Sequence, residues 1–135
     1  MQTCRRIALP RFVDARGELI ALEHGSGLPF PIKRVFYMRK VPAEASRAQH
    51  ALKTCEQFII AVQGSFQTTV TDGRQSRTFL LDDPNSGVYV PAMVWRTVDA
   101  FTPDAICLVL ASTEFSEDDY VRDYSAYIAL SGGRQ

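Results

Sequence analysis

The residue of this sequence best suited to chemistry is His50, in the segment Arg47-Ala48-Gln49-His50-Ala51-Leu52. An imidazole titrates near neutral pH, so it can take up and return a proton during a reaction. In an extended strand His50 and Leu52 point to the same face, because side chains alternate with period two. We therefore predict that an imidazole and an isobutyl group face one cavity. The competing interpretation is a structural histidine bonded to the backbone.

Three arginines accompany this histidine, namely Arg34, Arg47 and Arg96. A guanidinium group binds the paired oxygens of a carboxylate or a diphosphate, although any single arginine is more often a solvated charge. Trp95 precedes Arg96, and the segment 84–96 is predicted to bring both residues to the cavity of His50. Trp95 and the aromatic residues near Arg34 either stack on a base or fill the core.

The elements that must position these groups are short strands. The run 58–62 is apolar on both faces of any strand, which is typical of a strand buried on both sides. Further strands are predicted at 4–9, 19–22, 32–38, 66–71, 76–81, 88–90, 95–98 and 106–111, separated by glycine, proline and aspartate. Asp72-Gly73 is a strong hairpin signal. Many short strands at regular spacing predict an all-β sandwich or jelly roll.

Only the end of the chain changes its periodicity. Ser116 precedes three acidic residues and resembles a helix N-cap. Tyr120, Tyr124, Tyr127 and Ile128 then recur at helical spacing, so a short C-terminal helix is predicted to pack on the sandwich.

A jelly roll with a histidine on an inner strand raises the question of a metal site, as in metal-binding cupins. That pattern requires His-x-His, a glutamate a few residues later and a further histidine on a later strand. Here the positions hold His50, Leu52, Glu56 and Arg96. Leucine cannot coordinate a metal, and a guanidinium group has no lone pair to give. We predict no metal and no other cofactor.

Composition bounds the remaining possibilities. The 135 residues are predicted to form one domain, 1–135, and 15 basic and 15 acidic residues balance. This balance argues against binding to nucleic acid or to an anionic membrane. The apolar runs are too short to span a bilayer, and the N-terminus lacks the apolar stretch of a signal peptide. Three cysteines without CxxC spacing favour free thiols, so a cytoplasmic location is expected.

Several segments, taken together and in order, resemble the sugar 3,4-ketoisomerase family of cupins, also called WxcM-like. They are Arg16-Gly17-x-Leu19, Pro29-Phe30-x-x-Lys33-Arg34-Val35-Phe36-Tyr37, Arg47-x-x-His50-Ala51, Cys55-x-Gln57-Phe58, Gly64-Ser65, Leu80-Leu81-Asp82-Asp83-Pro84, Gly87-Val88-Tyr89-Val90-Pro91-x-Met93-x-Trp95, Leu108-Val109-Leu110-Ala111-Ser112 and Asp119-Tyr120-Val121-Arg122-Asp123-Tyr124. The resemblance covers nearly the whole chain.

The resemblance implies a metal-free cupin jelly roll that forms a homodimer by exchanging N-terminal strands, here residues 4–22. It implies an isomerase that interconverts 4-keto and 3-keto forms of a dTDP-linked 6-deoxyhexose through an enediol, in deoxyaminosugar biosynthesis. His50 and Tyr37 are the expected catalytic residues. The expected substrate-binding residues are Arg16, Arg34, Arg47, Trp95 and Arg96.

The sequence departs from the family at one position of consequence. The family usually reads Arg-Gly-x-His-Ala-His, and the second histidine is Leu52 here. Two alternatives therefore remain beside the ketoisomerase. One is a dTDP-sugar 3,5-epimerase, which shares the fold and needs a histidine base and a tyrosine acid. The other is a non-catalytic cupin that binds a sugar nucleotide.

Overall fold

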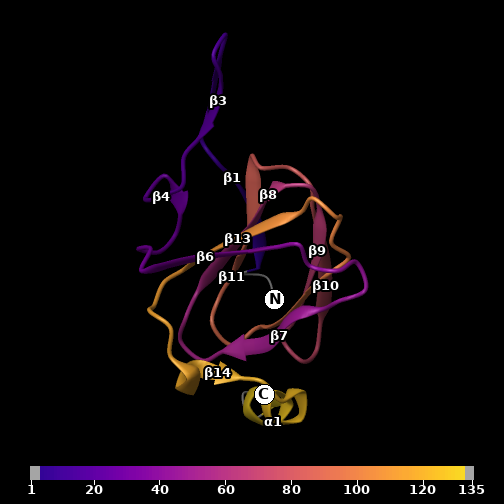
Figure 1. The fold of residues 1–135 in the computed structure, drawn as a ribbon. Helices are drawn as coiled ribbons and strands as arrows, with labels where there is room; N and C mark the ends of the chain where they lie inside the picture. Colours follow the sequence, from indigo (N-terminus) through magenta and orange to yellow (C-terminus); the bar gives the residue numbers. More distant parts are fainter. Residues whose placement is uncertain (1–3, 133–135) are drawn as a thin grey trace.

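The computed structural model describes residues 4–132, which form a sandwich of two antiparallel sheets and a C-terminal helix (Figure 1). The elements are β1 (Arg5–Ala8), β2 (Arg11–Asp14), β3 (Gly17–Ile20), β4 (Glu23–His24), β5 (Gly27–Leu28), β6 (Arg34–Arg39), β7 (Arg47–Leu52), β8 (Gln57–Gln63), β9 (Phe66–Thr71), β10 (Ser76–Leu81), β11 (Ser86–Val90), β12 (Trp95–Asp99), β13 (Ile106–Ala111), the 3₁₀ turn η1 (Glu117–Asp119), β14 (Tyr120–Val121) and α1 (Tyr124–Gly132). One sheet has the order β1-β11-β8-β13-β6 and the other β10-β9-β12-β7-β14. The predicted all-β jelly roll is confirmed.

Strand β8 lies at the centre of the first sheet and is buried on both faces, as its apolar run predicts. Ile59 and Ala61 contribute to the main core between the sheets, whereas Phe58 and Ile60 contribute to a second cluster. That second cluster is completed by Leu28, Phe30 and other residues that precede β6. Only Val62, at the end of the predicted run, is exposed, at 45%. Each face of the sheet therefore carries its own apolar layer.

The predicted hairpin at Asp72-Gly73 is confirmed. Strands β9 and β10 pair antiparallel, with Thr71 opposite Ser76. The Asp72 carboxylate accepts hydrogen bonds from the backbone N–H groups of Arg74 and Gln75, and Gly73 takes a positive φ of 93°. A side chain that bonds its own turn and a glycine in the left-handed region are what such a turn requires.

The C-terminal helix is confirmed, but its predicted start at Ser116 is wrong. Helix α1 begins at Tyr124, and the Asp123 carboxylate accepts the N–H of Ala126. Ser116 makes no capping bond with its side chain. The chain after η1 is extended instead, because β14 pairs with β7 and completes the second sheet. The tyrosine spacing therefore combines one strand residue with helical residues.

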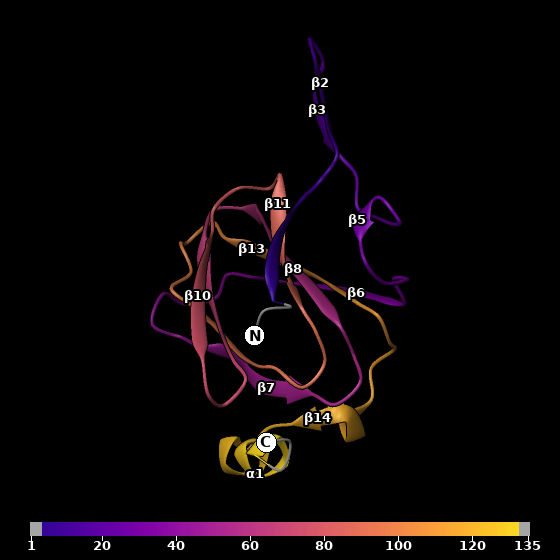
Figure 2. The same cartoon turned by 180° about the vertical axis from the view of Figure 1, so that it is seen from behind.

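An arm formed by β2 and β3 projects from the sandwich (Figures 1 and 2). These strands pair with each other, with Phe12 opposite Leu19, and these two residues are 62% and 60% exposed. Strand β1 pairs with β11 of its own chain, so within 4–22 only this arm leaves the body. Within residues 4–132, no helix is long and apolar enough to cross a membrane. The ends of the predicted domain 1–135 lie outside the described residues.

Candidate active site

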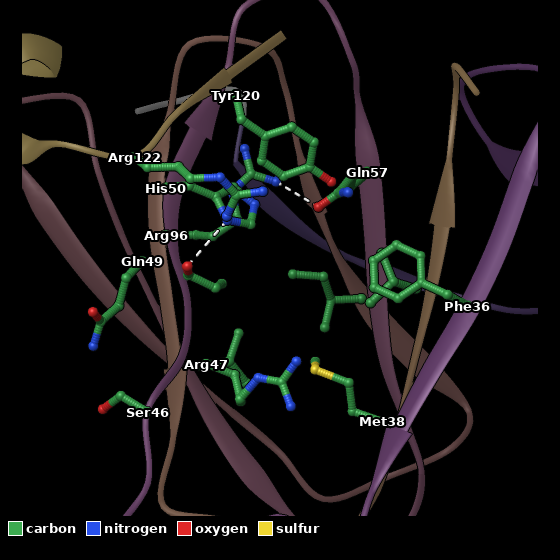
Figure 3. A pocket seen from close by; sticks show the side chains of 14 residues that line it. Phe36, Met38, Ser46, Arg47, Gln49, His50, Gln57, Arg96, Tyr120 and Arg122 are labelled. Carbon is green, nitrogen blue, oxygen red and sulfur yellow. Dashed lines mark hydrogen bonds between the residues drawn. The ribbon is translucent and has the colours of Figure 1, made fainter. Parts of the chain in front are cut away.

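A cavity of about 340 Å³ opens between the two sheets, beside β7 (Figure 3). Its volume lies within the range of small-molecule sites, about 300–1,000 Å³. The lining residues come from both sheets and from the C-terminal segment: Phe36, Met38, Ser46, Arg47, Ala48, Gln49, His50, Gln57, Ile59, Arg96, Val98, Val109, Tyr120 and Arg122. Three of them are arginines and none is a carboxylate. The cavity therefore favours an anionic ligand.

A β-bulge directs His50 into this cavity. Arg96 of β12 pairs with His50, but the next residue, Thr97, pairs with Ala48, so Gln49 is an extra residue in β7. Ala48 and Gln49 both have positive φ, 71° and 52°. Bulges of this kind commonly re-aim a side chain beside an active site. Ala48 stands where the family pattern has glycine, the residue that takes this conformation at no steric cost.

The imidazole of His50 is held as a neutral base. Its Nδ1 lies 3.1 Å from the carbonyl oxygen of Ala48, which can only accept, so Nδ1 carries the proton. Nε2 is buried and has no hydrogen-bond partner among the described residues. Burial lowers the pKa of His50 to about 4, and the charge of Arg96 adds to the effect. At neutral pH the Nε2 lone pair is free to accept a proton.

Arg96 is a cation enclosed by the protein, with 1% of its surface exposed. It donates to the Gln57 side-chain oxygen at 2.7 Å and to the Val94 carbonyl at 2.9 Å, and its Nε has no partner among the described residues. Burial lowers the pKa of Arg96 to about 10, so the group stays charged at neutral pH. A buried cation of this kind stabilises negative charge that develops nearby.

Tyr120 is a site residue that sequence reasoning assigned to the helix. Its ring meets the ring of His50 edge to face, with centroids 4.8 Å apart and a 67° angle between planes. Arg34 lies 3.5 Å from the Tyr120 hydroxyl, and the guanidinium of Arg122 covers the Tyr120 ring at 4.3 Å. A strand of two residues is too short to be predicted from alternation. The only sequence signal for this site residue was therefore the family motif Asp119-Tyr120-Val121-Arg122.

Asp119 anchors this C-terminal segment to the loop that follows β7. Its carboxylate accepts the backbone N–H groups of Thr54 and Cys55, at 2.9 and 3.1 Å. Its carbonyl accepts the N–H of Lys53 at 2.9 Å. These bonds hold β14 in register, so the position of Tyr120 beside the cavity is set by the backbone.

Leu52 does not face the cavity, which corrects the prediction made from strand alternation. It is fully buried, in a small cluster with Cys55 and Ala111, and Tyr120 packs against this cluster. Tyr120 is also the residue opposite Leu52 in the pairing of β14 with β7. Of this cross-strand pair, Tyr120 lines the cavity and Leu52 does not.

The remaining predicted site residues divide into those at the cavity and those away from it. Arg47 lines the cavity. Arg34 is not a lining residue, but its guanidinium group contacts the hydroxyl of Tyr120, which is one. Trp95 packs instead against Tyr127 in a separate cluster, because it points to the opposite side of β12 from Arg96. The structure thus differs from the expectation for Trp95.

Two further predicted residues, Tyr37 and Arg16, lie outside the cavity of their own chain. Tyr37 is 64% exposed and alternates with Phe36, which lines the cavity, so it occupies the outer face of β6. Arg16 lies at the tip of the arm and pairs with Asp14. Neither residue approaches His50 within one chain, which corrects the expectation that Tyr37 lies beside it.

Metal-binding side chains do not gather here. Among residues 4–132 no group of three or more His, Cys, Asp or Glu side chains is arranged to hold a metal ion. The charged groups near His50 are Arg96, Arg122 and Arg34, and a guanidinium group cannot coordinate a cation. The prediction of a site without metal stays a prediction, supported by the chemistry of these donors.

Fold and cavity together define a cupin-type jelly roll that places a neutral imidazole among fixed cations. The family model described as "FdtA: WxcM-like, C-terminal" matches residues 2–132. A TDP-4-oxo-6-deoxy-alpha-D-glucose-3,4-oxoisomerase from Aneurinibacillus thermoaerophilus is 36% identical over 121 residues, 90% of this chain and 87% of the relative. The chain therefore belongs to this FdtA, WxcM-like family, as the resemblance predicted.

Solved structures agree with this assignment. A sugar 3,4-ketoisomerase from Thermoanaerobacterium thermosaccharolyticum, in complex with TDP, is 33% identical with a TM-score of 0.95, over 99% of this chain and 98% of that chain. A TDP-quinovose 3,4-ketoisomerase from Campylobacter jejuni is 34% identical with a TM-score of 0.91, over 96% and 99% of the two chains.

The lowered pKa of His50 predicts a distinctive titration. Followed by NMR, the imidazole of His50 should titrate near pH 4, because burial and Arg96 oppose its protonation. The unfolded chain takes up this proton near the usual value of about 6.5. His50 should therefore lower stability progressively as the pH falls from that value towards 4. The chain contains two histidines, so His50→Asn assigns the signal. A midpoint near 6.5 would contradict the buried site.

The burial of Leu52 predicts that a second imidazole is costly at this position. Leu52→His should reduce the free energy of unfolding by about 1–3 kcal/mol, because a polar group enters an apolar cluster. Urea denaturation measures this change, with Leu52→Met as a control of similar volume. Equal stability of Leu52→His and the parent protein would show that position 52 reaches the solvent-filled cavity.

Proposed function

We propose that the protein is a sugar 3,4-ketoisomerase that interconverts the 4-keto and 3-keto forms of a TDP-linked 6-deoxyhexose. The observation that carries this proposal is the neutral imidazole of His50, whose buried Nε2 finds no hydrogen-bond partner within residues 4–132 and lies near the buried cation of Arg96. Relatives with this activity in their names match over almost the whole chain. Such an isomerase would serve in deoxyaminosugar biosynthesis.

The reaction moves a carbonyl from C4 to C3 of the sugar. A base must take the proton from C3, which is acidified by the neighbouring C4 carbonyl, and the electrons then pass to O4. His50 Nε2 is the base, because its lone pair is available at neutral pH. Arg96 stabilises the enediolate, because its charge is already buried and needs no reorganisation when the oxygen becomes negative.

The diphosphate is assigned to the arginines other than Arg96. Arg47 is exposed and lines the cavity, and Arg34 and Arg122 flank Tyr120. Guanidinium groups bind phosphate oxygens in pairs, so they suit a nucleotide diphosphate. Arg122 also forms a two-point ion pair with Glu117, with contacts of 2.7 and 3.0 Å, which leaves its ring contact with Tyr120 well positioned. No cofactor enters this proposal.

The two alternatives predict different isotope patterns. In deuterated water with TDP-4-keto-6-deoxyglucose, the ketoisomerase exchanges the C3 proton and forms a new keto sugar, as NMR would detect. A 3,5-epimerase exchanges both C3 and C5 with inversion. A binding cupin retains the sugar nucleotide without exchange. Either of the last two patterns would overturn the proposed function.

Replacing the base tests its role directly. His50→Asn should lower turnover about 10²–10⁴-fold, the usual contribution of a positioned general base. Binding of TDP, measured by calorimetry, should stay unchanged, because the nucleotide contacts lie elsewhere. His24→Asn is the matched control, since His24 lies on β4, outside the cavity. A His50→Asn protein with the parent turnover would show that His50 is only structural.

We also propose that the protein is a homodimer in which the β2–β3 arm of one chain covers the other. An isolated two-stranded hairpin is marginally stable, and this one exposes the cross-strand pair Phe12 and Leu19. Strand β6 is an open sheet edge with Val35 and Tyr37 exposed at 56% and 64%. Such edges pair readily with another chain. Within the dimer, Arg16 and Tyr37 contribute to the shared interface.

Light scattering tests this assembly. The parent protein should have the mass of two chains, and Leu19→Glu should shift it to one chain, because a carboxylate would be buried against the partner. Leu80→Glu is the control, since Leu80 is also exposed, at 50%, but lies on β10 in the other sheet. A monomeric parent protein at micromolar concentration would contradict the dimer.

A further inference from the structure

We propose that Tyr120 is the second catalytic residue and carries the hydroxyl proton between O4 and O3 of the sugar. This inference rests on the proposed ketoisomerase function and names the group that the reaction needs beside His50. The isomerisation exchanges two protons, one between carbons and one between oxygens. An imidazole on the carbon edge cannot by itself hold both at once.

The cavity offers few groups that release and regain a proton. Of its lining residues, His50, Tyr120 and Ser46 carry such groups, since the arginines stay charged and the glutamines do not titrate. Ser46 is exposed and precedes β7, and Figure 3 shows it at the far side of the cavity from His50. Tyr120 is half-buried and lies directly against His50. The geometry therefore favours Tyr120.

The hydroxyl of Tyr120 is oriented for donation. Arg34 can only donate, so in their 3.5 Å contact the phenol oxygen accepts and its own O–H remains free to point into the cavity. Arg34 places a positive charge beside the oxygen of Tyr120. This charge stabilises the oxygen while it is briefly without its proton. Arg122 covers the ring at 4.3 Å, with its own charge paired to Glu117.

Two proton transfers at His50 and two at Tyr120 complete the isomerisation. His50 Nε2 removes the proton from C3, the electron pair forms the C3–C4 double bond, and O4 takes the proton of the Tyr120 hydroxyl. The Tyr120 oxygen then takes the proton of the C3 hydroxyl as the C3 carbonyl forms, and C4 takes the proton from the His50 imidazolium. One proton has moved from C3 to C4 and one from O3 to O4. Both residues return to their starting states.

Tyr120→Phe tests the hydroxyl separately from the ring. The ring contacts with His50 and Phe115 remain in this variant, so the fold and the position of His50 should be preserved. Tyr124→Phe is the matched control, because Tyr124 packs on Trp95 and lies outside the cavity. Three quantities are measured for each protein with TDP-4-keto-6-deoxyglucose in deuterated water: TDP affinity, C3 exchange and net isomerisation.

We expect Tyr120→Phe to keep its TDP affinity and to lose net isomerisation by about 10²-fold or more. The exchange at C3 should fall much less, because His50 and Arg96 still form and return the enediolate. Tyr124→Phe should match the parent protein in all three quantities.

Other outcomes overturn the assignment. A parallel loss of exchange and isomerisation would mean that Tyr120 only positions His50, and parent rates for both would mean that its hydroxyl is not used. A parent protein that binds TDP but shows neither reaction would instead refute the proposed function, and this inference with it.

Discussion

The site depends on a cation that the fold encloses. Arg96 lies directly opposite His50 in the pairing of β12 with β7, and its guanidinium group is almost wholly shielded from water. Removing a charge from water costs several kcal/mol, so such a group persists only with good hydrogen bonds. Gln57 from the other sheet and the Val94 carbonyl supply them. The cation therefore joins the two sheets.

This constraint has a direct chemical consequence for His50. A nearby carboxylate raises the pKa of a histidine and favours its protonated form, whereas a nearby buried arginine lowers the pKa and keeps the ring neutral. The Ala48 carbonyl opposes this trend by favouring the protonated ring, but burial and Arg96 outweigh it. The same bond fixes the proton on Nδ1 and leaves Nε2 for the substrate. The bulge, the cation and the tautomer thus form one arrangement.

Sequence reasoning predicted the elements whose patterns are local. The run around Phe58, the turn at Asp72-Gly73 and the position of His50 beside a cavity follow from alternation, turn chemistry and residue type. For β6, the alternation separated Phe36 from Tyr37 but did not decide which face is internal, because both faces carry apolar residues. Only the packing of the two sheets decides this, and it places Phe36 inside.

The bulge in β7 could not be predicted from the sequence. Alternation assumes an unbroken strand ladder, and Ala48 and Gln49 are not residue types that indicate a left-handed backbone, as glycine would be. Similarly, Trp95 and Arg96 are neighbours in sequence but point to opposite sides of β12, so only one of them reaches His50. Tyr120 and Tyr124 have helical spacing, but Tyr120 lies in a strand that pairs with β7 and is anchored by the bonds of Asp119 to the loop after β7.

The departure from the family at Leu52 has a structural meaning that the sequence alone did not reveal. Because β14 lies opposite this part of β7, a side chain at position 52 rests beneath Tyr120 and not in the cavity. Leu52 gives the Tyr120 ring an apolar surface to pack against, and the ring in turn contacts the imidazole of His50. The leucine therefore changes what supports Tyr120 and leaves the groups that face the cavity in place.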